Sequence, residues 1–127
     1  MTIQCFLIDD DLDDQEIFVM ALQQVDENIH CTVAKDGIEG LRKLKTDISC
    51  VPQYIFLDVN MPKMNGIQCL SEIKKLHHLK DAQIIMFSTS SDAKIIQSTG
   101  ELGANDFLVK PPRLSLLVEA LGAILKR

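Results

Sequence analysis

Several features that define other classes of protein are missing from this chain of 127 residues. Its four cysteines include no C-x-x-C pair, so neither a zinc site nor a redox motif is indicated. We expect all four to be buried free thiols: Cys5, Cys31, Cys50 and Cys69. No repeat, linker or low-complexity segment divides the chain. Its length fits one compact domain, which we expect to span residues 1–127 without an output domain.

Basic charge and long apolar runs are also scarce. The formal net charge is −5, and because phosphate binding needs clustered Lys and Arg, we expect no nucleic-acid partner. No apolar run approaches the length of a membrane span, and the first residues lack the basic segment of a secretion signal. We therefore expect a cytoplasmic protein without a membrane partner, whose 46% hydrophobic residues suffice for a core.

Short apolar runs alternate along the chain with longer stretches of helical spacing. The predicted strands are Ile3–Ile8, His30–Ala34, Tyr54–Leu57, Gln83–Phe87 and Asn105–Val109. Helices are predicted around residues 18–25, 38–45, 67–73 and 92–102, and from residue 114 to the C-terminus. This alternation predicts an α/β fold, a doubly wound parallel sheet of five strands in the order 2-1-3-4-5, with helices on both faces.

Charged and hydroxyl side chains follow the predicted strands. Asp9 and Asp10 follow the first, Asp58 the third and Lys110 the fifth, while Ser88 follows the fourth. Because parallel strands end at one edge of a sheet, these groups should converge there. Three close carboxylates favour a cation such as Mg²⁺, and a carboxylate nucleophile beside a metal, a lysine and a hydroxyl fits phosphoryl transfer to Asp58. The neighbouring acids are expected to favour the first helix's N-terminus or face water: Asp11, Asp13 and Asp14.

These residues together carry a resemblance to a known family. The acidic pair, the pattern L-D-V-N-M-P-x-M-x-G over residues 57–66, Ser88 and Lys110-Pro111 are similar to receiver domains of bacterial two-component response regulators. The resemblance covers essentially the whole chain and implies a flavodoxin-like fold. It also implies that Asp58 accepts a phosphoryl group from a sensor histidine kinase or a histidine phosphotransfer protein. The modified domain would then relay the phosphoryl group or act on an unknown downstream protein.

The same resemblance assigns roles within the site. It implies that Asp10, Asp58 and the backbone carbonyl of Asn60 bind Mg²⁺, with Asp9 acting largely through water. It implies that Ser88 and Lys110 hold the phosphoryl oxygens. It further implies a cis bond between Lys110 and the proline that follows it. No cofactor other than Mg²⁺ is expected.

The sequence departs from the family at two positions. Ser88 stands where many members have threonine, and Phe107 where many have tyrosine. Phe107 lacks the hydroxyl that a tyrosine would use, so it is either a switch that works by ring packing or an ordinary core residue. The hydroxyl-rich stretch 88–92 and the acidic stretch 9–14 resemble single-domain regulators paired with phytochrome kinases.

Two other functions share features of this sequence. A phosphohydrolase of the haloacid-dehalogenase kind also uses a strand-end aspartate with Mg²⁺, but it usually has a second aspartate two residues later, where this chain has Asn60. A receiver-like module that binds partners without phosphorylation would be expected to lack Asp58, Lys110 or one of the acidic pair, and all are present. We therefore expect a signalling domain rather than an enzyme, with at most slow self-phosphorylation and self-dephosphorylation.

Overall fold

The computed structural model describes residues 3–48 and 51–125. Its strands are β1 (Gln4–Ile8), β2 (His30–Ala34), β3 (Tyr54–Leu57), β4 (Gln83–Ser88) and β5 (Asp106–Val109). Its helices are α1 (Leu12–Val25), α2 (Gly37–Thr46), α3 (Gly66–Lys74), a short 3₁₀ helix η1 (His77–Leu79), α4 (Ala93–Glu101) and α5 (Leu114–Leu125). Each predicted strand is confirmed, with ends that differ by no more than one residue.

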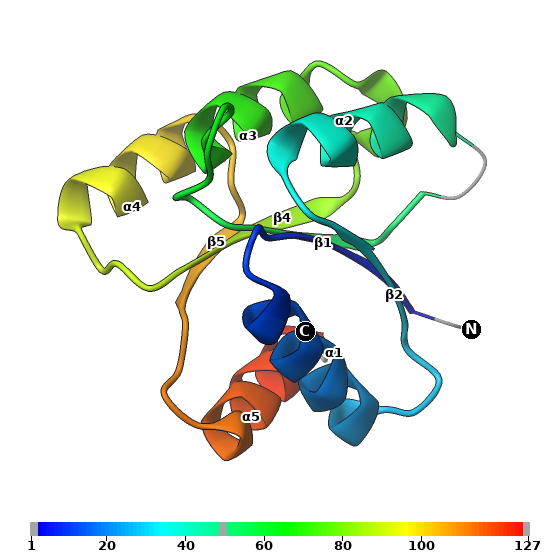
Figure 1. The fold of residues 1–127 in the computed structure, drawn as a ribbon. Coiled ribbons are helices and arrows are strands. Elements are labelled where there is room, and N and C mark those ends of the chain that lie inside the picture. Colours follow the sequence, from blue (N-terminus) through cyan, green and yellow to red (C-terminus); the bar gives the residue numbers. More distant parts are fainter. Residues whose placement is uncertain (1–2, 49–50, 126–127) are drawn as a thin grey trace.

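The strands form one parallel sheet in the order β2-β1-β3-β4-β5. Helices α2, α3 and α4 lie on one face of this sheet, and α1 and α5 lie on the other (Figure 1). The predicted flavodoxin-like topology is therefore confirmed. The carboxyl ends of β1, β3, β4 and β5 meet along one edge, where the candidate residues lie.

Each central strand contributes to two cores. Phe6 and Ile8 of β1 pack in the cluster beneath α2 and α3, whereas Cys5 and Leu7 pack with α1 and α5. In β3, Phe56 contributes to the second cluster, in contact with Phe18 of α1, ring centroid to ring centroid 4.8 Å apart. A parallel sheet buried on both faces needs apolar residues at every position, which explains the continuous apolar runs in the sequence.

Aspartate and asparagine side chains cap the N-termini of helices that follow the strands. The Asp11 carboxylate accepts a hydrogen bond from the Asp14 N–H at the start of α1, and Asp36 does the same for α2. Asn65 forms a capping box with Gln68 at the start of α3. These caps fix the first turn of each helix directly above the carboxyl edge of the sheet.

The apolar residues of α2 do not all face the core. Ile38 is 51% exposed, while Leu41 and Leu44 are buried. Gly37 and Gly40 take the inner positions of the first turns. A Cβ atom on Gly40 would lie 2.5 Å from the Cδ1 atom of Ile8, so glycine allows α2 to approach β1 closely.

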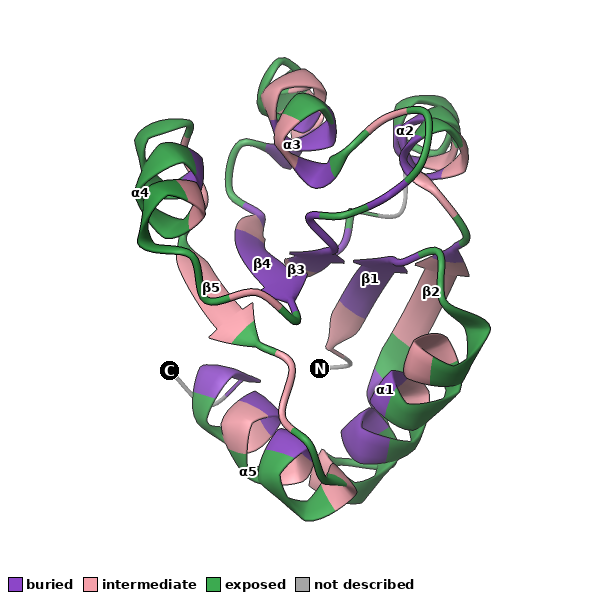
Figure 2. Cartoon of the chain, turned by 60° about the vertical axis from the view of Figure 1, so that its left-hand side comes forward, coloured by how far each residue is buried: buried purple, intermediate pink, exposed green. Residues whose placement is uncertain are grey.

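Helix α4 is the least buried of the described helices. Thr99 is its buried residue, Ile95 is half-buried and Ile96 is 38% exposed. Leu102, directly after the helix, is exposed as well. Figure 2 shows α4 almost entirely in the exposed colour, in contrast to the inner side of α3. The predicted helix is therefore present, but its apolar side chains contribute little to the core.

The expectation of buried free thiols holds for part of the cysteine set. Cys5 and Cys69 are buried and free, and Cys31 is free but only partly buried. Burial raises the pKa of each of these three thiols to about 12, so they stay protonated near neutral pH. Cys50 lies outside the described residues.

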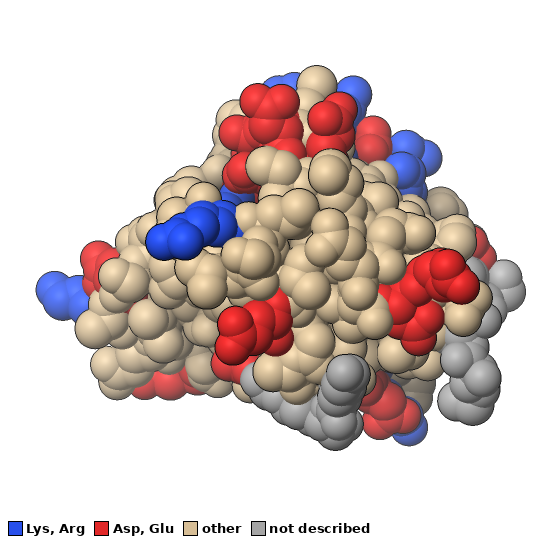
Figure 3. All heavy atoms as spheres, turned by 90° about the horizontal axis from the view of Figure 1, so that it is seen from below, with Lys and Arg blue, Asp and Glu red and all other residues tan. Residues whose placement is uncertain are grey.

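The outer surface agrees with the acidic composition. Figure 3 shows acidic groups scattered over the face formed by α1 and α5, with wide uncharged areas between them. Lys and Arg side chains do not gather into a patch in this view. Among the described residues, no helix has the length and apolar character needed to cross a membrane.

Candidate functional site

Asp58 is held at the point where β3 turns into its loop. Its N–H donates to the Ile8 carbonyl (3.0 Å), and the Gly66 N–H returns to the Val59 carbonyl (2.8 Å). A Cβ atom on Gly66 would overlap the Asp58 carbonyl oxygen and lie 2.7 Å from the Val59 Cα atom. Only glycine therefore lets α3 begin this close to Asp58, which is buried.

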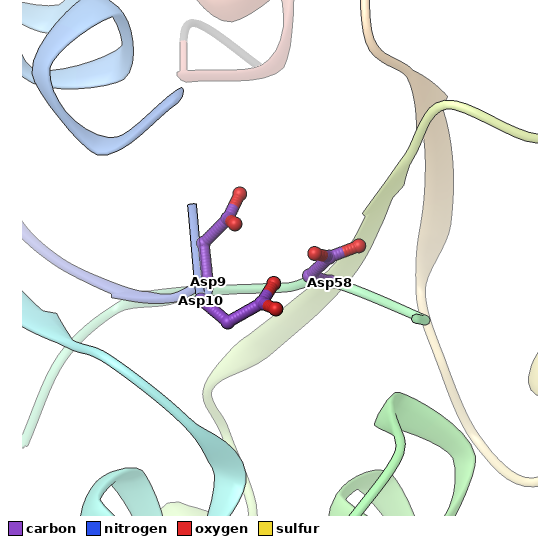
Figure 4. A group of neighbouring side chains, drawn as sticks. All are labelled: Asp9, Asp10 and Asp58. Carbon is purple, nitrogen blue, oxygen red and sulfur yellow. The ribbon is translucent and has the colours of Figure 1, made fainter. Parts of the chain in front are cut away.

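Three carboxylates meet at this edge of the sheet, as the strand ends predicted. Asp9 and Asp10 follow β1 and lie beside Asp58 (Figure 4), with one oxygen atom of each within 4.8 Å of the others. Asp9 and Asp58 are buried and Asp10 is exposed. Closely spaced, hard oxygen donors with one side open to solvent fit the ligand preference of Mg²⁺.

Lys110 reaches back from the end of β5 into this cluster. Its Nζ atom lies 2.9 Å from Asp9 Oδ2, 2.8 Å from Asp14 Oδ2 and 3.6 Å from Asp58 Oδ2. The ammonium group is also 5.2 Å from the centre of the Phe87 ring. The side chain is 10% exposed, so its charge acts in a partly desolvated environment.

Asp14 is a site residue that the sequence interpretation missed. We expected it to favour the start of the first helix or to face water, but its carboxylate pairs with Lys110. Asp14 does lie in the first turn of α1, and its N–H donates to Asp11 Oδ1 (3.1 Å). One signal could have found it, because the first turn of a helix that directly follows a strand end lies over the same sheet edge.

Burial dominates the electrostatics of the two inner carboxylates. It raises the pKa of Asp58 to about 7, against the opposing charge of Lys110, and the negative charge of Asp9 adds to the rise. Burial also raises the pKa of Asp9, although the Asp11 N–H and Lys110 stabilise its charged form. A cation bound here would favour the deprotonated carboxylates and so relieve this cost.

Lys110 responds in the direction expected of a cation among acids. Burial by itself would lower the pKa of Lys110, but the hydrogen bonds to Asp14 and Asp9 and the charge of Asp58 outweigh it. The net effect is a raised pKa, which keeps the ammonium group charged at neutral pH. The site therefore holds a permanent positive charge next to Asp58.

Ser88 and Asn60 complete the set of candidate residues. Ser88 is buried at the end of β4, where its carbonyl accepts the Lys110 N–H (2.7 Å) and its Oγ accepts the Ser90 N–H (3.1 Å). The pairing of Leu57 with Met86 puts Ser88 just beyond the level of Asp58. Asn60 is exposed, and its N–H points at Asp58 Oδ1 from 3.4 Å. A serine hydroxyl that accepts one bond still has a hydrogen to donate.

Phe107 lies in β5, away from the carboxylates. It is half-buried and packs against the cluster beneath α3, together with Ile95 of α4. This position is compatible with both alternatives derived from the sequence, a switch or a core residue. Phe107 is not among the fully buried residues of the core.

The expected cis bond between Lys110 and Pro111 was wrong. The bond is trans, as is every peptide bond among the described residues. The trans isomer of an X–Pro bond is favoured by about 0.5–1 kcal/mol unless surrounding contacts select the other. Here the Lys110 N–H already reaches the Ser88 carbonyl (2.7 Å) and its Nζ reaches Asp9 (2.9 Å), so the contacts of Lys110 do not require a cis bond.

The fold, together with the acids, the lysine and the hydroxyl at one edge of the sheet, is that of the receiver domains. Residues 5–122 match the response regulator receiver domain family, and the chain belongs to that family. It is 30% identical over 115 residues to the chemotaxis protein CheY of Thermotoga maritima, covering 91% of this chain and 94% of that protein. It is 36% identical over 122 residues to the transcriptional regulatory protein CpxR homolog of Haemophilus influenzae.

The extent of these matches differs. The match to the CpxR homolog covers 95% of this chain but 49% of that protein, so the chain spans about half its length. Among solved structures, the phosphorylated cyanobacterial phytochrome response regulator RcpA has a TM-score of 0.86 at 26% identity, covering 99% of this chain and 93% of that one. The Mn²⁺-bound form of response regulator Rcp1 has a TM-score of 0.83 at 26% identity, covering 95% and 90%.

Proposed function

We propose that this receiver domain accepts a phosphoryl group on Asp58 from a sensor histidine kinase or a histidine phosphotransfer protein. The observation that carries the proposal is the burial of Asp58 at the end of the central strand, 3.6 Å from the charged Lys110. We further propose that the domain works in the cytoplasm, as a signalling module without turnover of external substrates. It either relays the phosphoryl group or changes its binding to a downstream protein.

The chemical step is a displacement at phosphorus. A carboxylate oxygen of Asp58 forms a bond to the phosphorus atom, while the bond from phosphorus to the histidine nitrogen breaks. The electron pair of that bond stays on the imidazole, and Asp58 becomes an acyl phosphate. Lys110 offsets the charge on the phosphoryl oxygens, and the Ser88 hydroxyl donates a hydrogen bond to one of them.

The converging acids support a Mg²⁺ site, and the family resemblance suggests its ligands. Asp10 and Asp58 would supply carboxylate oxygens, and Asn60 would supply its backbone carbonyl. Asp9 is suited to contact through water, because its Oδ1 accepts the Asp11 N–H (3.0 Å) and its Oδ2 is bound to Lys110 (2.9 Å). The ion supplies positive charge that offsets the carboxylates and the incoming phosphoryl oxygens. Support comes from Rcp1, a relative in fold whose structure contains Mn²⁺.

The response to phosphorylation would spread from Ser88 towards α4. The phosphoryl group replaces one negative charge by about two and adds acceptor oxygens. For the Ser88 hydroxyl to reach these oxygens, the loop after β4 would have to move inward. This movement would free space beside Phe107, which is half-buried. Because α4 is held by few buried side chains, we infer that α4, β5 and α5 form the face that changes.

Small phosphoryl donors test this function without the cognate kinase. Wild type and Asp58→Asn are incubated with acetyl phosphate and Mg²⁺, and intact mass is followed over time. We expect one phosphoryl group on wild type and none on Asp58→Asn, which keeps the size of the side chain but lacks the nucleophilic carboxylate. Equal labelling of both proteins would contradict the role of Asp58. Wild type that takes no label from the donor or from any histidine kinase would instead favour a binding module that works without phosphorylation.

A further inference from the structure

The Lys110 ammonium group is shared among carboxylates from three segments of the chain. Its contacts to Asp14 (2.8 Å) and Asp9 (2.9 Å) have hydrogen-bond geometry. The contact to Asp58 is longer, at 3.6 Å, and is an ion pair only. In this structure Lys110 is therefore directed towards α1 and the end of β1 more than towards the proposed phosphoacceptor.

Asp14 differs from the other two acids in its surroundings. It is the third residue of α1, and its backbone N–H is fixed by the Asp11 cap (3.1 Å). Its side chain is 33% exposed, whereas that of Asp9 is fully buried. It is not one of the carboxylates that converge to hold a metal ion. Asp14 thus contacts the lysine of the site without belonging to the metal cluster.

We propose that Asp14 is a positioning residue: it draws Lys110 towards α1, so that the ammonium group stays beyond hydrogen-bond distance of Asp58 in the unphosphorylated state, and it competes with the phosphoryl group for Lys110. The proposal rests on the proposed function, since it concerns the same lysine and the same acceptor. A phosphoryl group on Asp58 needs the charge of Lys110, so the pair with Asp14 must weaken as the group arrives. Asp14 also repels the incoming anion directly, and both effects slow phosphorylation.

The size of the effect follows from the exposure of the pair. An ion pair with a partly exposed partner contributes up to about 1 kcal/mol, so its removal should accelerate phosphorylation about threefold to fivefold. Asn at position 14 keeps the size and helix position of the side chain but removes the charge. Asp13 provides the matched control, because it lies in the same helical turn, is exposed, and has no contact with Lys110 among those the structure shows.

The first experiment compares the rates at which acetyl phosphate with Mg²⁺ labels wild type, Asp14→Asn and Asp13→Asn. In this step an Asp58 oxygen bonds to phosphorus, the phosphorus–oxygen bond to acetate breaks, and acetate leaves with the electron pair. We expect Asp14→Asn to be labelled about threefold to fivefold faster than wild type, and Asp13→Asn at nearly the wild-type rate. In a Lys110→Met background, which lowers the basal rate, Asp14→Asn should give a clearly smaller gain.

The second experiment needs no phosphoryl transfer. Urea unfolding with a chelator is measured for Asp14→Asn, Lys110→Met and the double variant, and separately for Asp13→Asn with Lys110→Met. The Asp14 and Lys110 changes should be non-additive, and the Asp13 and Lys110 changes additive. If both pairs are additive, Asp14 does not hold Lys110 and the inference is wrong.

The two experiments separate the possible failures. Wild type that takes no label would overturn the proposed function, and with it the competition inferred here. Wild type that is labelled on Asp58, with Asp14→Asn no faster than Asp13→Asn, would overturn this inference alone. If Asp14→Asn raised the labelling rate by the same factor in wild type and in the Lys110→Met background, Asp14 would act by repelling the phosphoryl donor and not by competing for the lysine, and the inference would be wrong.

Discussion

Single residues decide the chemistry of this site, and Asp58 carries the largest electrostatic cost. Its pKa in the folded chain, about 7, lies above the ordinary value of 3.8, so the folded state holds the proton more tightly than the unfolded state. The resulting stability is fully present below pH 3.8 and is lost as the pH rises through about 7. At neutral and alkaline pH without metal, the buried charge therefore destabilises the fold.

Asp58→Asn should remove this pH dependence. With a chelator present, we expect the variant to exceed wild type in free energy of unfolding at pH 8, by on the order of 1–3 kcal/mol, and by much less at pH 4.5. Urea unfolding at the two pH values measures it. Asp13→Asn removes an exposed acid of equal charge and should show no comparable trend. If wild type were more stable than Asp58→Asn at pH 8, the claim that the buried Asp58 charge destabilises the fold would be wrong.

Gly66 acts on the site through sterics. Gly66→Ala would place a Cβ atom against the Asp58 carbonyl oxygen and the Val59 Cα atom, so backbone must shift. We expect a loss of about 1–3 kcal/mol in the free energy of unfolding and slower labelling of Asp58. Gly100→Ala is the matched control, because its added Cβ would have no neighbour within 4 Å apart from the adjacent residues and the backbone of its own helix, and it should stabilise α4 by up to about 1 kcal/mol. Equal effects of the two substitutions would refute the steric role of Gly66.

At the scale of elements, the strands were readily predicted and the helix faces less so. A strand buried on both sides requires an unbroken apolar run, and Tyr54–Leu57 is such a run with no competing helical pattern. The first turn of α1 is an exposed Leu12 followed by Asp13, Asp14 and Gln15, so it has no buried apolar residue from which the direction of the Asp14 side chain could be predicted. In α2, glycines occupy inner positions of the first turns and carry no hydrophobic signal, so apolar spacing alone does not show that Ile38 is exposed.

The difference between α3 and α4 leads to a prediction about dynamics. Both helices have nine residues, but α3 buries Gly66, Cys69, Leu70 and Ile73, and α4 buries Thr99. Fewer buried contacts lower the free energy of local opening, so amide hydrogens of α4 should exchange clearly faster than those of α3. Hydrogen exchange followed by mass spectrometry or NMR measures this. Equal protection of the two helices would argue against α4 as the mobile part of the output face.

At the scale of the whole molecule, the topology itself assembles the site. Residues near positions 9, 58, 88 and 110 meet because β1, β3, β4 and β5 are parallel neighbours that end at one edge. This convergence could be predicted from strand order alone. Chain order also places the first turn of α1 near this edge, but the contact of Asp14 with Lys110 and the trans bond after Lys110 could not be predicted, because they depend on side-chain reach and on contacts between distant segments.

Metal binding should stabilise the whole fold through this edge. A ligand that binds only the folded state adds RT ln(1 + [L]/Kd), about 2.7 kcal/mol at a hundredfold excess over Kd. We expect Mg²⁺ to raise the melting temperature of wild type, with a much smaller rise in Asp10→Asn and an unchanged rise in Asp13→Asn. Melting curves that do not move with saturating Mg²⁺ would count against the metal site.

The most direct test of the account is to locate the phosphoryl group on the labelled chain. After reaction with a phosphoryl donor and Mg²⁺, borohydride reduces the acyl phosphate, and peptide mass mapping identifies the altered residue. The account predicts that the reduced product is at position 58 and that neither Asp9 nor Asp10 is modified. A label on another residue, with Asp58 unmodified, would contradict the central claim.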